Sequence, residues 1–181
     1  MARKVPQPLD FEALMAYAAR ILSSRAQTIA ELREKLRRRA ARREDADQVL
    51  TRLKESGYLN DARFAESFAT LRRENQGLGQ TRVFRDLMAR RVAPAVAKKA
   101  AETAYREVDE IVLIENFLTR KYRGKNLGAL LAEEKHLASA YRKLRTAGFS
   151  FGNSIRVLKR YAAEAERLED MEDDHPTQDL E

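Results

Sequence analysis

Residues 57–65 read Gly57-Tyr58-Leu59-Asn60-Asp61-Ala62-Arg63-Phe64-Ala65. Gly57 can take the left-handed conformation that ends a helix, and we predict that Tyr58 packs back on Leu53 in a Schellman cap. Asn60 then suits the N-cap of a following helix, with Leu59 and Phe64 as a hydrophobic staple across that cap. Because both sides of the joint are specified, we expect two helical units to be held at a defined angle.

Apolar residues recur at helical spacing along nearly the whole chain, and strand-like alternation is absent. Thr28 and Glu31 form a capping box before Leu32 and Leu36, and the spacing of such helices repeats along the chain. The predicted fold is all-α, with nine helices in tandem three-helix repeats that form an elongated, curved array. The predicted segments are an N-terminal tail at 1–8, repeats at 9–57, 58–107 and 108–163, and an acidic tail at 164–181.

The three repeats differ at the joint between their second and third helices, where Ala40, Arg91 and Gly148 occupy equivalent places. Only Gly148, with Phe149 after it, has the chemistry of a Schellman cap. A non-glycine residue held left-handed costs about 1 kcal/mol or more. We therefore expect the joints at Ala40 and Arg91 to be closed differently or to be looser.

The composition excludes several classes of protein. The 181 residues are 44% hydrophobic and 35% charged, which is typical of a folded chain that can bury a core. Cysteine is absent, so disulfides, a thiol nucleophile and cysteine metal sites are excluded. No apolar run approaches the ~20 residues that span a bilayer. These features predict a soluble, cytoplasmic protein with no membrane partner.

Charge is distributed unevenly along the chain. The stretch from Glu164 to Glu181 holds nine acidic residues and one basic residue, so it carries −8. The whole chain carries +7, which leaves +15 on residues 1–163. A basic body favours a polyanion or an acidic protein surface as partner, and the acidic tail could compete for that surface. The alternative is an ordinary solvated surface followed by a disordered terminus.

Candidate contact residues are the basic side chains left outside the apolar stripes of the second and third helix of each repeat. They are Lys35, Arg37, Arg38, Arg42 and Arg43 in the first repeat, Arg82, Arg85 and Arg90 in the second, and Arg142, Lys143, Arg156, Lys159 and Arg160 in the third. Equivalent helices would thus present cations repeatedly. The alternative for each residue is a solubilising surface charge with no partner.

Catalytic and metal-binding patterns are incomplete. Glu133-x-x-His136 has the spacing found in di-metal carboxylate bundles, but no second such motif accompanies it. Gly124-Lys125-Asn126 imitates the end of a phosphate loop, yet Thr119 stands where its leading glycine belongs. We predict no catalytic residue, no metal site and no cofactor, and we expect that the protein is not an enzyme.

The order of the motifs resembles one known family. Thr28-x-x-Glu31-Leu32-x-x-Lys35-Leu36, followed by Gly57-Tyr58-Leu59-Asn60-Asp61-x-Arg63-Phe64-Ala65, is similar to the pattern of the RecX family, regulators of the RecA recombinase. Gly79-x-x-Arg82-x-x-x-x-Leu87 and Ala147-Gly148-Phe149-Ser150 fit the same family. The resemblance covers about Leu9 to Ala162. Ala40 and Arg91 depart from it, because glycine is expected at both joints.

The resemblance implies a monomeric regulatory protein that binds the groove of the RecA filament on DNA. It also implies inhibition of strand exchange and of the associated ATPase activity, and thus a role in homologous recombination, DNA repair and the SOS response. Two alternatives stay open from the residues alone. The three-helix units could bind single- or double-stranded DNA directly as helix-turn-helix modules, or the array could be a general helical scaffold.

Overall fold

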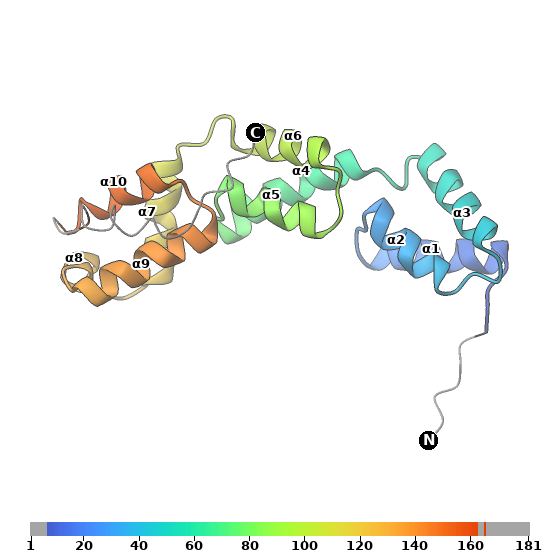
Figure 1. The fold of residues 1–181 in the computed structure, drawn as a ribbon, viewed down its shortest axis with the longest axis horizontal. Helices are drawn as coiled ribbons and strands as arrows, with labels where there is room; N and C mark the ends of the chain where they lie inside the picture. Colours follow the sequence, from blue (N-terminus) through green and yellow to red (C-terminus); the bar gives the residue numbers. More distant parts are fainter. Residues whose placement is uncertain (1–6, 163–164, 166–181) are drawn as a thin grey trace, which may run out of the picture. The chain divides into compact units, whose positions relative to one another are not determined.

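The computed structural model describes residues 7–162 and residue 165, and within them the chain is all-α as predicted (Figure 1). The predicted acidic tail lies almost entirely outside the described residues. The chain divides into two compact units, one formed by residues up to Ala69 together with Phe84–Thr103, the other by Thr70–Val83 and the residues from Ala104 onward. The division into three repeats and the curved shape stay predictions.

The first unit is built on three helices that follow one another in the chain. They are α1 at Phe11–Ser24, α2 at Ile29–Arg37 and α3 at Arg43–Glu55. The unit also holds most of α4 (Asp61–Leu71), α5 (Gln80–Ala89) and α6 (Pro94–Tyr105). Leu14, Leu32, Leu36 and Val49 are fully buried in its core. The apolar stripes predicted from helical spacing therefore face inward as expected.

Both helix starts predicted by capping chemistry in this unit are confirmed. The Thr28 hydroxyl accepts from the Glu31 amide at 3.1 Å, and the Glu31 carboxylate accepts from the Thr28 amide at 3.1 Å, which completes the capping box at α2. The Asn60 side chain accepts from the Arg63 amide at 3.0 Å and so caps α4. These local patterns determine where the helices begin.

The joint at residues 57–60 differs from the prediction in one contact. Gly57 has φ +73°, as expected, and its amide donates to the Lys54 carbonyl at 3.0 Å. The packing predicted for Tyr58 is wrong, because that side chain is 76% exposed. Leu59 is buried instead, and its amide donates to the Leu53 carbonyl at 3.1 Å. The apolar cap of α3 is therefore one residue later than the sequence pattern indicated.

The two joints without glycine close in different ways. At Ala40 the chain is held by a bridge to Leu9, whose amide donates to the Arg39 carbonyl at 2.7 Å and whose carbonyl accepts from Ala41 at 2.8 Å. Arg91, in contrast, takes the left-handed conformation itself, with φ +60°. The Val92 amide then donates to the Leu87 carbonyl at 3.2 Å, as in a Schellman cap. We expected both joints to close without a Schellman cap, and this expectation is confirmed at Ala40 and wrong at Arg91.

We predict that Arg91→Gly is more stable than Arg91→Ala by about 1 kcal/mol, because glycine alone is free of the left-handed penalty. Both variants lose the exposed ion pair of Arg91 with Glu34 at 2.8 Å, so that pair cancels in the comparison. Urea unfolding followed by far-UV circular dichroism measures the difference. Equal midpoints for the two variants would contradict the assigned strain.

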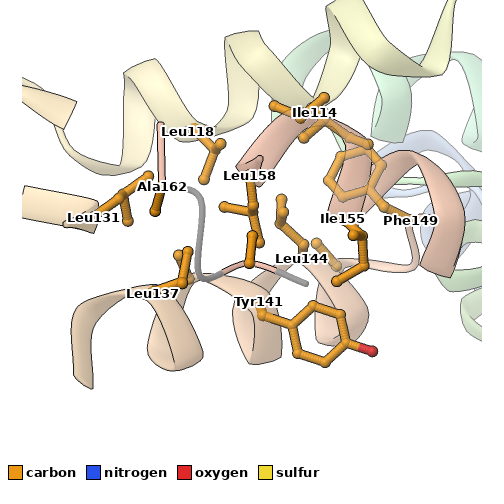
Figure 2. Packing of buried hydrophobic residues seen from close by; sticks show 14 residues of the cluster. Ile114, Leu118, Leu131, Leu137, Tyr141, Leu144, Phe149, Ile155, Leu158 and Ala162 are labelled. Atoms are coloured by element: carbon orange, nitrogen blue, oxygen red, sulfur yellow. The ribbon is translucent and has the colours of Figure 1, made fainter. Parts of the chain in front are cut away.

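The second unit is built around α7, α9 and α10. After α4 the chain makes a π-helical turn, η1 (Arg72–Gln76), and the unit continues through α7 (Glu110–Lys121), α8 (Leu127–Leu131), α9 (Glu134–Ala147) and α10 (Phe151–Leu158). Figure 2 shows the core, with Ile114 and Leu118 of α7 facing Leu144 and Leu158. The region around residues 121–131 contains the short helix α8, which is capped by Asn126.

Two motifs that are far apart in the sequence contact each other in this unit. The Gly79 amide donates to the Ala147 carbonyl at 2.8 Å, and Arg82 donates to the Thr146 carbonyl at 3.3 Å. Gly148 has φ +87°, and the Phe149 amide donates to the Leu144 carbonyl at 3.2 Å, which confirms the predicted Schellman cap. The start of α5 is therefore docked on the turn between α9 and α10.

Candidate partner-binding surface

The basic residues predicted on α2 and α3 are mostly paired within the first unit. Arg37 contacts Asp47 at 3.2 Å, Arg42 contacts Asp45 at 2.9 Å, and Arg38 pairs with Glu34. Lys35 donates to the Gln27 side chain at 2.7 Å, whereas Arg43 is exposed. Neighbouring carboxylates therefore neutralise much of the positive charge that the sequence predicted here.

Arg90 is turned into the first unit and does not belong to an exposed face. Its guanidinium is bidentate to the Glu31 carboxylate at 2.8 and 2.7 Å, and its side chain is 15% exposed. It also lies over the rings of Phe64 and Phe68, at 4.5 and 5.6 Å from their centroids. We therefore remove Arg90 from the candidate contact residues, whereas Arg85, on α5, is exposed.

The contacts around Glu31 and Arg90, which we call the Glu31–Arg90 node, also include Thr28 and Asp61, two further residues of the motif that carries the family resemblance. The Thr28 hydroxyl donates to the Arg90 carbonyl at 3.0 Å, and the Asp61 carboxylate accepts from the Ile29 amide at 2.8 Å. Burial alone would raise the pKa of Glu31, but hydrogen bonds from Arg90 and the Thr28 amide, with the charges of Arg90 and Arg25, hold that pKa below its usual value. These motif residues hold α2, α4 and α5 together.

The basic residues of α10 and of the turn that follows it do not gather into one site. Arg156, Lys159 and Arg160 are exposed, and Arg160 pairs with Glu115 of α7. None of the three lines the basic concavity of the second unit that is described below. They contribute general positive charge to the second unit.

A basic groove is present in the second unit, between η1, α5, α7 and α9. We call it the basic groove, and it has a volume of about 430 Å³. Its lining residues are Arg72, Gln76, Leu78, Arg82, Phe117, Lys121, Ser139, Arg142, Lys143, Thr146 and Ala147. Five of these are cations and none is a carboxylate, so the groove favours an anionic ligand. A separate concavity, in the first unit, has a lining that includes Glu44, Asp47 and Glu55 and does not share this property.

The π-helical turn supplies one wall of the basic groove. Arg120 donates to the carbonyls of Asn75 at 3.3 Å and Gln76 at 2.7 Å, and Gly77 ends the turn at φ +58°. Arg72 donates to the Gln76 side chain at 2.5 Å, so both lie on the groove side of the turn. Isolated π-helical turns are frequent at functional sites.

Three of the five cations of the basic groove are among the contact residues predicted from the sequence. Arg82, Arg142 and Lys143 were predicted, whereas Arg72 and Lys121 were missed. Arg72 lies in a stretch that reads as ordinary α-helix, and Lys121 is the last residue of α7. The Tyr122 hydroxyl accepts a hydrogen bond from Lys143 at 3.1 Å, and the Lys143 ammonium lies 4.9 Å from the centroid of the Tyr122 ring.

The remaining sequence candidates show no further site in the described residues. His136 lies 3.4 Å from Glu133, and no group of three or more potential metal ligands occurs in residues 7–162. Among the helices that the structure describes, none is both long and apolar enough to cross a membrane.

Comparison with known proteins identifies the family. Residues 15–53 match the model for the first three-helix domain of RecX, and residues 60–100 match that for the second. A regulatory protein RecX from Amycolatopsis mediterranei is 34% identical over 152 residues, covering 83% of this chain and 86% of the relative. The chain belongs to the RecX family. A RecX from Deinococcus radiodurans is 35% identical over 153 residues, covering 84% of this chain and 70% of that protein.

A solved RecX structure has the same fold. The crystal structure of RecX from Lactobacillus salivarius matches with a TM-score of 0.62 at 18% identity, covering 84% of this chain and 96% of the other. Membership of the RecX family of regulatory proteins agrees with the resemblance of the motifs. Since several of those motif residues form the Glu31–Arg90 node and the Gly79–Gly148 contact, what the family pattern specifies here is mainly structure.

Proposed function

We propose that this RecX family member binds the RecA nucleoprotein filament, inhibits strand exchange and the associated ATPase activity, and has no catalytic activity of its own. Membership of the RecX family carries this proposal. The basic groove supports it physically, because an array of cations accelerates encounter with an anionic nucleoprotein surface. Such a role places the protein in the cytoplasm, as a monomer that modulates recombination, DNA repair and the SOS response.

The test is DNA-dependent ATP hydrolysis by RecA in the presence of increasing amounts of this protein. We expect hydrolysis to fall as the protein approaches a stoichiometric ratio to RecA. Unchanged hydrolysis at a molar excess would rule out the proposed inhibition. Bovine serum albumin at the same concentration controls for nonspecific effects.

Binding to bare DNA and to RecA-coated DNA separates the alternatives. The proposed function predicts preference for the coated DNA. A protein that acted as a set of helix-turn-helix modules would bind bare DNA equally well, with a steep dependence on salt. A general scaffold would bind neither.

A further inference from the structure

The cations of the basic groove differ in how they are held. Lys143 contacts the Tyr122 hydroxyl at 3.1 Å, and Arg82 donates to the Thr146 carbonyl at 3.3 Å, so these two are positioned by the fold. Lys121 and Arg142 are exposed at the rim and form no hydrogen bond or ion pair with the described residues. A ligand with several negative charges can therefore engage both the cations that the fold positions and the two exposed cations at the rim.

The floor of the groove is apolar. Leu78, Phe117 and Ala147 line it, and each packs against the core of the second unit. Phe117 meets the Phe149 ring edge-on, with centroids 5.4 Å apart, which fixes its position. A purely anionic ligand would leave this floor unfilled, so the best-matched ligand also carries an apolar group.

The chemistry of the lining distinguishes a peptide from a single-stranded nucleic acid. Base binding uses open aromatic faces, yet Phe117 is half-buried against Phe149 and is the only ring that lines the groove. A phosphodiester backbone also has no apolar group for the floor. An acidic peptide matches both parts of the groove, with carboxylates at the cations and an apolar side chain below.

We propose that the basic groove binds an acidic segment of the protein partner, whose one apolar side chain inserts between Leu78 and Phe117. This inference rests on the proposed function, because it takes a protein filament as the partner. It adds the location of the contact and the chemistry of the partner segment.

The test compares two doubly substituted full-length proteins with equal loss of charge. Lys121→Ala/Arg142→Ala removes the exposed rim of the groove, whereas Arg123→Ala/Lys125→Ala removes two exposed cations that do not line it. The probe is a fluorescein-labelled peptide with one phenylalanine flanked on both sides by glutamates. Peptides with glutamine for glutamate or serine for phenylalanine, and a labelled oligothymidylate, are the comparison ligands.

We expect the acidic peptide to bind the rim variant about tenfold more weakly than it binds the control variant. The reason is that two contacts between a cation of the groove and a carboxylate of the peptide are lost. Both altered peptides should bind the parent protein more weakly than the acidic peptide does. Equal affinity of the two variants for the acidic peptide would overturn the inference. So would a rim-dependent loss that is confined to the oligothymidylate, which would assign the groove to nucleic acid.

RecA inhibition distinguishes failure of this inference from failure of the proposed function. If the parent protein does not inhibit RecA, the proposed function fails whatever the peptide does. If the parent inhibits and the rim variant inhibits equally well, only the groove assignment fails. Far-UV circular dichroism of both variants verifies that they are folded before these assays.

Discussion

Gly148→Ala is expected to destabilise the second unit by about 3 kcal/mol. Two costs add at this position. The backbone has φ +87°, which costs a non-glycine residue about 1 kcal/mol or more. A Cβ atom there would also lie 2.8 Å from the Arg82 Cα and closer still to the Arg82 amide nitrogen, and relieving such overlap costs about 1–3 kcal/mol.

Alanine substitutions at three other glycines separate the cost of the left-handed backbone from the cost of the overlap. Gly79→Ala adds overlap without a left-handed backbone, since its Cβ would lie 2.7 Å from the Phe149 amide nitrogen. Gly57→Ala adds the left-handed penalty in open space. Gly152→Ala adds neither and lies in α10, where alanine is the better helix former. We expect Gly148→Ala to be the most damaging and Gly152→Ala to be neutral or slightly stabilising.

Urea unfolding and hydrogen exchange measure this series. Exchange in α7, α9 and α10 should accelerate in the Gly148 and Gly79 variants, because they separate α5 from the turn after α9. A Gly148→Ala protein as stable as Gly152→Ala would show that the contact with Arg82 is absent in solution.

Arg90→Ala is expected to destabilise the first unit by about 2–4 kcal/mol. The substitution removes a bidentate pair and the cation over two phenylalanine rings, and it leaves the Glu31 carboxylate, 25% exposed, without its main partner. Arg85→Ala is the matched control, because it removes the same charge from an exposed site on α5. That change should alter stability by no more than about 0.5 kcal/mol.

The pH dependence of unfolding tests the Glu31–Arg90 pair separately. The pKa of Glu31 is lowered in the folded state, so this carboxylate stabilises the fold at pH values above its unfolded pKa of about 4.3. The contribution is lost as the pH falls through the lower, folded pKa. Arg90→Ala should therefore lose less stability than the parent on acidification below about pH 4, and an unchanged pH profile would contradict the pairing. Arg90→Lys should recover only part of the loss, since it cannot make the bidentate contact.

Basic residues that are paired inside a unit and basic residues that are exposed on the groove therefore call for different experiments. Arg90 was predicted as a contact residue from its sequence position, yet it is built into a structural node. If the proposed inhibition of RecA is lost in an Arg90 variant, unfolding of the first unit accounts for the loss. Lys121 and Arg142 are exposed on the groove, so their substitution tests recognition directly.

Local chemistry in the sequence determined where several helices of this protein begin and end. The capping box at Thr28 and Glu31, the Asn60 cap and the glycine joints at Gly57 and Gly148 were all predictable, since each depends on residues within a few positions of one another. Helical periodicity determined the fold class and most of the core for the same reason. The choice between Tyr58 and Leu59 as the buried cap residue was not predictable, because both are apolar enough to fill it.

Only the tertiary structure decided which charges act together. Arg72 reaches the basic groove through a π-helical turn whose carbonyls are held by Arg120, a residue 44 positions away from Gln76. Arg90 turns inward because Glu31, 59 positions earlier in the chain, supplies its carboxylate. A charge pattern specifies the amount of charge on a helix, whereas pairing and burial depend on contacts distant in sequence. The helices were therefore predictable from the sequence alone, and the basic groove was not.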